Sequence, residues 1–200
     1  QTADSTESPS PADIPSAPAQ PAEEVPAAAD RAYPSYPDDY EMVDAASLPD
    51  PAQVQRIIEL NTAAAEWYGQ QYTGSPAAAY MASRFGTDLA DDPRFTVGYA
   101  PTRGLAEHLA QHHGATKEEL HEAGLMLRAE KDGRYFELFR DRVVVAIRNT
   151  EGQIVGFSGR AAPNAPPTAR KYVNTPNTAA FDKGSLLYGL AENQPALAAG

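Results

Sequence analysis

Proline and acidic residues are concentrated at one end of this 200-residue chain. Residues 1–53 contain ten of the eighteen prolines and eleven acidic residues, against one base, Arg31. A segment of this composition buries too little apolar surface to offset the conformational entropy that folding removes. We therefore expect residues 1–50 to form a disordered acidic tail or linker rich in proline and alanine, and residues 51–200 to form the folded part.

Charge divides the chain in the same way. The formal net charge is -11, yet residues 54–200 hold sixteen acids and fifteen bases. Residues 131–183 contain nine bases and five acids, a local balance of +4. Because arginine and lysine bind phosphate groups, this basic stretch is typical of a surface for a polyanion. The alternative is a solvated hairpin with ordinary surface arginines.

The sequence contains no cysteine, which excludes disulfides and thiolate zinc sites and fits a reducing compartment. It has no run of about 18 apolar residues, and its first 30 or so residues lack a basic start followed by an apolar run. We therefore expect a cytoplasmic protein without a membrane partner. The chain begins with Gln1 and not with Met, and its composition does not change before it ends at Gly200. We therefore also expect it to be a piece of a longer protein.

Four helices are expected in the first part of the folded region, from the helical spacing of apolar residues and from capping signals. Ser75 is a typical N-cap and Pro76 a typical first helical residue. Thr116 and Glu119 form a capping-box pattern. The four helices are expected over residues 54–74, 76–84, 102–113 and 116–124.

Beyond Gly124 the apolar pattern changes to period two, as expected for strands. Asn149–Gly152 is a turn sequence between two of these runs, and residues 185–193 are expected to form a last helix. The predicted fold class is therefore α+β, with N-terminal helices, a small antiparallel sheet and a C-terminal helix, preceded by the tail. The strand runs are 135–136, 143–147 and 154–157, and residues 95–100 form a strand or an extended link.

Two glycines interrupt the strand at residues 153–160. Strict alternation would place Ile154, Gly156 and Arg160 on one face. Glycine within a strand often marks close approach by a backbone or a ligand, so Gly156 and Gly159 favour a binding site beside Arg160.

A polar, basic turn follows this strand. Lys171 can bind a phosphate and Tyr172 can stack, while Asn174 and Thr175 can hydrogen-bond to sugar or phosphate oxygens. Lys183 comes twelve residues after Lys171, at the start of the predicted last helix, where free backbone N–H groups also favour an anion. The two lysines and the helix start are expected to converge on one polyanion site.

Four sequence blocks lie in a fixed order between residues 139 and 190. They are FRDRVVVAIRN (139–149), EGQIVGFSGR (151–160), KYVNTPNT (171–178) and FDKGSLLYGL (181–190). In order and spacing they resemble the bacterial DnaG-type DNA primase, specifically the N-terminal subdomain of its RNA-polymerase catalytic core, which precedes the TOPRIM domain. The resemblance covers roughly residues 52–194.

The resemblance implies a part of an enzyme that synthesises RNA primers on single-stranded DNA for replication. It places Arg160, Lys171 and Lys183 where the family has bases that hold the template strand or nucleotide phosphates, with Asn174 beside them. Arg142 falls in the matching FRDR block, where a structural role is the alternative. The chain departs from the family pattern at Asn177, where Glu or Asp is common.

The resemblance also implies parts that this sequence lacks. The metal-binding acids of the family, which hold Mg²⁺ or Mn²⁺, lie in the TOPRIM domain, and a zinc-binding domain precedes the core. We therefore expect no catalytic residue, metal ligand or cofactor in this chain, and no activity of the chain alone. The implied partners are single-stranded DNA template, RNA primer, NTPs, the TOPRIM domain of the same parent chain and a replicative helicase.

Two other functions remain open at this point. One is a non-catalytic module of a plasmid, phage or mobile-element protein that binds single-stranded nucleic acid. The other is a scaffold that acts through residues 1–50. A zinc site at His108 and His112 is disfavoured, because no HExxH motif is present and a solvated helix face explains their spacing.

Overall fold

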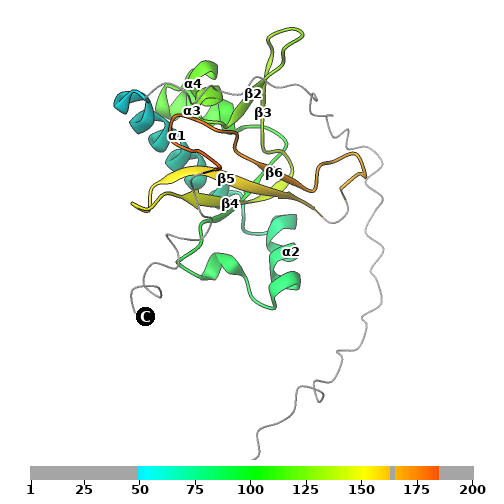
Figure 1. Cartoon of the computed structure of the whole chain (residues 1–200). Coiled ribbons are helices and arrows are strands. Elements are labelled where there is room, and N and C mark those ends of the chain that lie inside the picture. The colour runs from blue at the N-terminus through cyan, green and yellow to red at the C-terminus, as the bar shows by residue number, and fades with distance from the viewer. Residues whose placement is uncertain (1–48, 163–164, 185–200) are drawn as a thin grey trace, which may run out of the picture. The chain divides into compact units, whose positions relative to one another are not determined.

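The computed structural model describes residues 49–162 and 165–184 (Figure 1). The predicted tail and the predicted helix at residues 185–193 lie outside the described residues. Helices and a small antiparallel sheet make up the described part, which confirms the predicted α+β class. No helix in this part is both long enough and apolar enough to cross a membrane.

Helix α1 begins three residues before and ends four residues before its predicted bounds, whereas α2 begins where its capping signal predicts. Helix α1 is Pro51–Gln70, and Asp50 caps it by accepting a hydrogen bond of 3.0 Å from the Ala52 N–H group. Helix α2 is Pro76–Phe85, and the Ser75 hydroxyl accepts a hydrogen bond from the N–H group of the third helical residue. Both helices begin with proline, whose missing N–H group costs nothing in the first turn.

The next two helices are short. Helix α3 is Leu105–His113, so it begins later than predicted, after Gly104 at φ 120°. Helix α4 is Lys117–Glu122, and both hydrogen bonds of the predicted capping box are present. A 3₁₀ helix, η1 (Leu89–Asp91), was not predicted.

The main sheet is antiparallel and has four strands in the order β1-β4-β5-β6. A separate two-stranded hairpin pairs β2 with β3. Strand β6 is an edge strand, and its sequence predicted only a turn. The strands are β1 Val97–Ala100, β2 Met126–Arg128, β3 Tyr135–Glu137, β4 Arg142–Arg148, β5 Ile154–Ala161 and β6 Tyr172–Asn174.

An irregularity at the start of β5 corrects one predicted face. The register shifts between Ile147 and Arg148, which pair with Gly156 and Ile154 respectively. This bulge leaves Val155 unpaired and restarts the alternation. As a result Ile154 packs in the same hydrophobic cluster as Phe157, and not on the face of Arg160 as strict alternation predicted.

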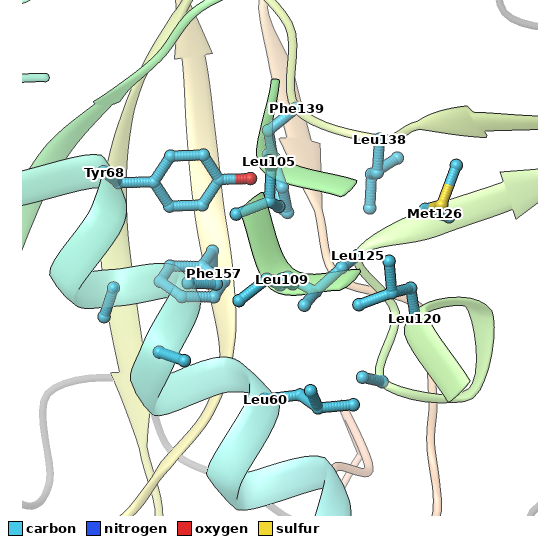
Figure 2. Close-up of a cluster of buried hydrophobic side chains, with 14 of the residues drawn as sticks. Leu60, Tyr68, Leu105, Leu109, Leu120, Leu125, Met126, Leu138, Phe139 and Phe157 are labelled. Atoms are coloured by element: carbon cyan, nitrogen blue, oxygen red, sulfur yellow. The ribbon is translucent and has the colours of Figure 1, made fainter. Parts of the chain in front are cut away.

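The sheet lies between helices, with α1, α3 and α4 on one side and α2 on the other (Figure 1). On the first side, the rings of Tyr68 from α1 and Phe157 from β5 meet edge to face at 5.5 Å (Figure 2). Leu105 and Leu109 of α3 complete this larger core. On the second side, Tyr72, Ala77 and Met81 pack with Val97 and Val143 in a smaller cluster.

Helix α1 approaches β1 most closely at Gly98. A Cβ atom at residue 98 would lie 2.6 Å from Tyr68 Cβ and 2.7 Å from the Tyr68 carbonyl carbon. Contacts this short do not occur in folded proteins, so only glycine allows α1 to pack on the sheet at this distance.

A buried carboxylate joins the hairpin to α3. The first turn of α3 has no side-chain cap from Gly104, and Glu137 at the end of β3 takes that role. One carboxylate oxygen of Glu137 accepts hydrogen bonds of 3.0 Å from the N–H groups of Gly104 and Ala106. Burial nevertheless raises the pKa of Glu137, because these hydrogen bonds only partly offset the loss of hydration.

The raised pKa of Glu137 predicts how the stability of the protein changes with pH. A carboxyl group whose pKa is higher in the folded state contributes stability at low pH and loses it as the pH rises from the ordinary value of 4.5 through the folded value. In the Glu137→Gln variant the new side chain carries no charge, yet its amide oxygen can still accept both hydrogen bonds. We therefore expect the free energy of unfolding of this variant to increase relative to that of the wild type as the pH rises through this window. Urea unfolding of both proteins between pH 4 and about pH 8 measures the difference, and a constant difference would contradict the assignment.

Candidate nucleic-acid interface

Strands β5 and β6 present a polar face beyond the edge of α2. Their register pairs Ser158 with Asn174 and Arg160 with Tyr172, so these four side chains lie on one face of the sheet. It is the face on which Val143 and Val145 of β4 pack against α2. The smaller hydrophobic cluster covers the part of this face that β1 and β4 form. On β6, Tyr172 and Asn174 are exposed.

Arg160 lies between two tyrosine rings. Its guanidinium carbon is 5.0 Å from the ring centroid of Tyr80, on α2, and 5.3 Å from that of Tyr172. A guanidinium N–H group also donates to the hydroxyl of Tyr172. The ammonium group of Lys171 lies 5.8 Å from the same ring centroid. Two cations and two aromatic rings thus form one cluster, and Tyr172 remains 52% exposed.

A cavity of about 140 Å³ lies beside this cluster, between β6 and the β2–β3 hairpin. The hairpin side contributes apolar groups from Leu127 and Leu138, and Asn174 and Lys183 bring polar and charged groups. The structure therefore places two of the predicted binding residues at the same cavity. Its lining consists of Leu127, Leu138, Arg170, Tyr172, Val173, Asn174, Pro176 and Lys183.

Thr175 has a structural role, which corrects its predicted role as a ligand contact. It is fully buried, and its hydroxyl accepts a hydrogen bond of 2.9 Å from the Phe157 N–H group. Gly156 makes room for it, because a Cβ atom at residue 156 would lie 2.9 Å from Thr175 Cβ and Oγ1. The close approach predicted at this glycine is therefore made by the protein itself.

Two backbone N–H groups just before the predicted last helix are also used within the protein. The Lys183 N–H group donates to Asn177 Oδ1 at 3.2 Å, and the Gly184 N–H group donates to Asp182 Oδ1 at 3.1 Å. The prediction of an anion site at the helix start concerns residues 185 onward, which lie outside the described residues, so it stays a prediction. Lys183 is one of the residues that line the cavity.

Arg142 lies in the interior and not on the binding face. Its side chain is 1% exposed, and its Nη1 group donates a hydrogen bond of 2.7 Å to the carbonyl oxygen of Arg170. Gly159 leaves space for it, since a Cβ atom there would lie 3.3 Å from Arg142 Cδ and 2.6 Å from Phe139 Cδ1. We correct the predicted ligand contact at Arg142 accordingly, because a buried guanidinium that anchors the chain before β6 cannot also reach a surface ligand.

Sequence patterns did not identify every residue at this interface. Tyr80 lies 80 residues before Arg160 in the sequence, and no local pattern connects the two. Leu127 belongs to a strand of three residues that was not predicted. Arg170 was visible only as one base of the basic stretch, next to Lys171.

The described part of the chain contains no group of three or more His, Asp or Glu side chains that could hold a metal ion. The ring centroids of His108 and His112 lie 4.5 Å apart on α3, and that of His113 lies 6.3 Å from His108.

Comparison with known proteins gives the family. Residues 67–194 match the sequence family described as DNA primase catalytic core, N-terminal domain. The chain belongs to this DNA primase family. The resemblance inferred from the four sequence blocks is thereby confirmed, and the cluster and cavity both lie on residues inside the matched range of the primase domain.

Relatives of this primase domain are longer than the chain itself. A DNA primase from Deinococcus radiodurans is 39% identical over 148 residues, which cover 72% of this chain and 24% of that protein. The chain thus spans about a quarter of the length of this curated relative.

Solved primase structures share the fold. The RNA polymerase domain of the Mycobacterium tuberculosis primase DnaG, solved in complex with double-stranded DNA, matches with a TM-score of 0.64 and 32% identity over 73% of this chain and 46% of that one. A DnaG primase catalytic domain bound to single-stranded DNA matches with a TM-score of 0.61 and 29% identity over 74% of this chain and 46% of that one.

Proposed function

We propose that this domain holds the single-stranded DNA template and the incoming nucleotide in a primase that synthesises RNA primers for DNA replication. The observation that carries the proposal is the Arg160–Tyr172–Lys171 cluster beside a cavity that Asn174 and Lys183 line. Cationic groups can neutralise phosphates, and an exposed aromatic ring can stack on a base whatever its sequence. The DNA-bound primases of the same fold support this function over a nucleic-acid-binding module outside replication.

Catalysis in this proposal depends on the rest of the parent protein. The TOPRIM domain would hold Mg²⁺ or Mn²⁺ and carry out the phosphoryl transfer, while this domain binds and orients the polynucleotide. NTPs, the growing RNA primer and a replicative helicase are the further proposed partners, and replication would place the protein in the cytoplasm.

Replacement of both proposed phosphate-binding lysines, Lys171 and Lys183, tests the proposal. We expect the Lys171→Ala/Lys183→Ala double variant to bind single-stranded DNA about tenfold more weakly, because two phosphate contacts are lost. The slope of log affinity against log salt should also fall by about 1.4, at about 0.7 for each contact. Fluorescence anisotropy with a labelled oligonucleotide between 50 and about 300 mM salt measures both quantities.

The chain supplies a matched control, because its only other lysines are Lys117 and Lys131. Both are exposed and neither lines the cavity among the described residues. The Lys117→Ala/Lys131→Ala variant has the same net charge as the test variant. Equal losses of affinity in the two double variants would show that the protein binds DNA by overall charge alone and would refute the proposed site.

A further inference from the structure

A tight turn at residues 178–181 connects the cavity-lining residues Asn174 and Pro176 to Lys183. Thr178 and Phe181 pair across it through two backbone hydrogen bonds, of 2.8 and 3.2 Å. Both side chains are buried, and Phe181 packs against Ile147 and Val155 of the sheet. The turn is therefore fixed at its base, and the residues on either side of it, Asn177 and Asp182, face each other.

The side chain of Asn177 connects the two arms of this turn. Its carbonyl oxygen accepts the hydrogen bond from the Lys183 N–H group, and its amide nitrogen donates to Asp182 Oδ1 at 3.3 Å. The same carboxylate oxygen accepts from the Gly184 N–H group. One neutral side chain thus holds the backbone of Lys183 and also orients the acid that precedes it.

The position of this contact explains why it matters for binding. Lys183 is exposed, and a lysine side chain has several rotatable bonds, so the location of its ammonium group depends on the position of its backbone. Lys183 lines the same cavity as Asn174, three residues before Asn177. A link at Asn177 therefore sets the distance between the lysine and the polar groups of β6.

We propose that Asn177 is a positioning residue that fixes Lys183 at the rim of the cavity and thereby strengthens polynucleotide binding. This inference rests on the proposed function, because it acts through Lys183 as a phosphate contact. An amide is suited to the task because it can accept from the Lys183 N–H group and donate to Asp182 at the same time. A carboxylate could accept but could not donate, and it would repel Asp182.

A double-mutant cycle in the full chain tests the inference. We expect Asn177→Ala to weaken binding of a labelled single-stranded DNA of about 15 nucleotides roughly threefold to fivefold, the effect of one lost hydrogen bond. In the Lys183→Ala background the same substitution should change the affinity by less than about 1.5-fold, because its target is gone. Equal losses in both backgrounds, or no loss in the first, would overturn the inference.

Exchanging the two polar residues supplies a second readout. In Asn177→Asp two carboxylates face each other, which raises the pKa of one of them, so the binding defect relative to wild type should shrink as the pH falls toward about 5. The defect of Asn177→Ala should not change with pH in this way. The exchange variant Asn177→Asp/Asp182→Asn restores both hydrogen bonds at the wild-type net charge and should restore the affinity at pH 7. A failure of this exchange to restore binding would contradict a positioning role.

The outcomes separate this inference from the proposed function. If Lys183→Ala binds DNA as tightly as the wild type, then the assignment of Lys183 is wrong and the role of Asn177 is wrong with it. If Lys183→Ala binds more weakly and Asn177→Ala does not, then only the role of Asn177 is wrong.

Discussion

The Arg142→Ala variant should unfold at a temperature about 6 to 12 °C below that of the wild type, a loss of about 3 kcal/mol. The substitution empties a site where a long side chain is almost fully buried, and it removes the hydrogen bond to the carbonyl oxygen of Arg170. Both a cavity and the loss of a hydrogen bond from a buried side chain destabilise a folded protein. Thermal unfolding followed by circular dichroism measures the midpoint.

Arg134 provides the control for the loss of one arginine charge. Its side chain is 83% exposed, and it pairs with Asp132 at 2.6 Å on the hairpin. Because exposed ion pairs add little stability, we expect Arg134→Ala to shift the midpoint by less than about 2 °C. If Arg142→Ala instead kept the wild-type midpoint and bound DNA more weakly, Arg142 would be a ligand contact, as its place in the FRDR block first indicated.

The Gly98→Ala variant should lose about 2 to 3 kcal/mol of folding free energy, equivalent to roughly 4 to 12 °C in the unfolding midpoint. The added methyl group would overlap the Cβ atom and the backbone of Tyr68, and neither can move unless α1 moves away from β1. That movement would open the larger core, in which Tyr68 packs against Phe157. Chemical denaturation of both proteins gives the difference directly.

Gly69, the residue after Tyr68 on α1, provides a control of the same chemical change. A Cβ atom at residue 69 would have no neighbour within 4 Å among the described residues. Because alanine favours the helical state over glycine, Gly69→Ala should raise stability by about 0.5 to 1 kcal/mol. Destabilisation by both substitutions to the same extent would show that the distance between α1 and β1 is not the cause.

The helices could be predicted because their signals are local. Ser75 and Thr116, which the sequence marks as caps, cap α2 and α4 within three residues of their own positions. Asp50 acts in the same way at α1, although it was not predicted as a cap. The β4–β5 hairpin could be predicted for the same reason, since its turn sequence Asn149–Gly152 lies between two apolar runs. Gly152 has a positive φ of 79°, which favours glycine there.

The strands β2 and β6 could not be predicted, because each has three residues with no recognisable strand pattern and exists only through its partner. Strand β3 is as short, but its adjacent aromatic residues Tyr135 and Phe136 favour a strand. Tyr172–Asn174 contains one apolar aliphatic residue, so no period could be read from it. The bulge at Val155 was hidden for a related reason: a register shift depends on the facing strand β4. Such features depend on tertiary pairing and not on local sequence.

The residues of the candidate site likewise fall into those that the sequence indicates and those whose role only the fold shows. Lys171, Asn174 and Lys183 were proposed from the type and spacing of residues, and the last two line one cavity, while their contact with a polyanion stays a prediction. Arg142 and Thr175 have the same chemistry as ligand contacts, and only their burial shows that they support the protein from within. Composition and spacing indicate which residues can bind a phosphate, but the fold decides which of them reach the surface.

The edge position of β6 has a consequence for self-association. An exposed edge strand can pair with an edge strand of a second molecule and so begin aggregation. Strand β6 offers only three residues for such pairing, Pro176 lies two residues beyond its end, and the flanking Lys171 would bring like charges together in a dimer of edges. The positive charge that suits this edge to a polyanion therefore also discourages two copies of the protein from joining there.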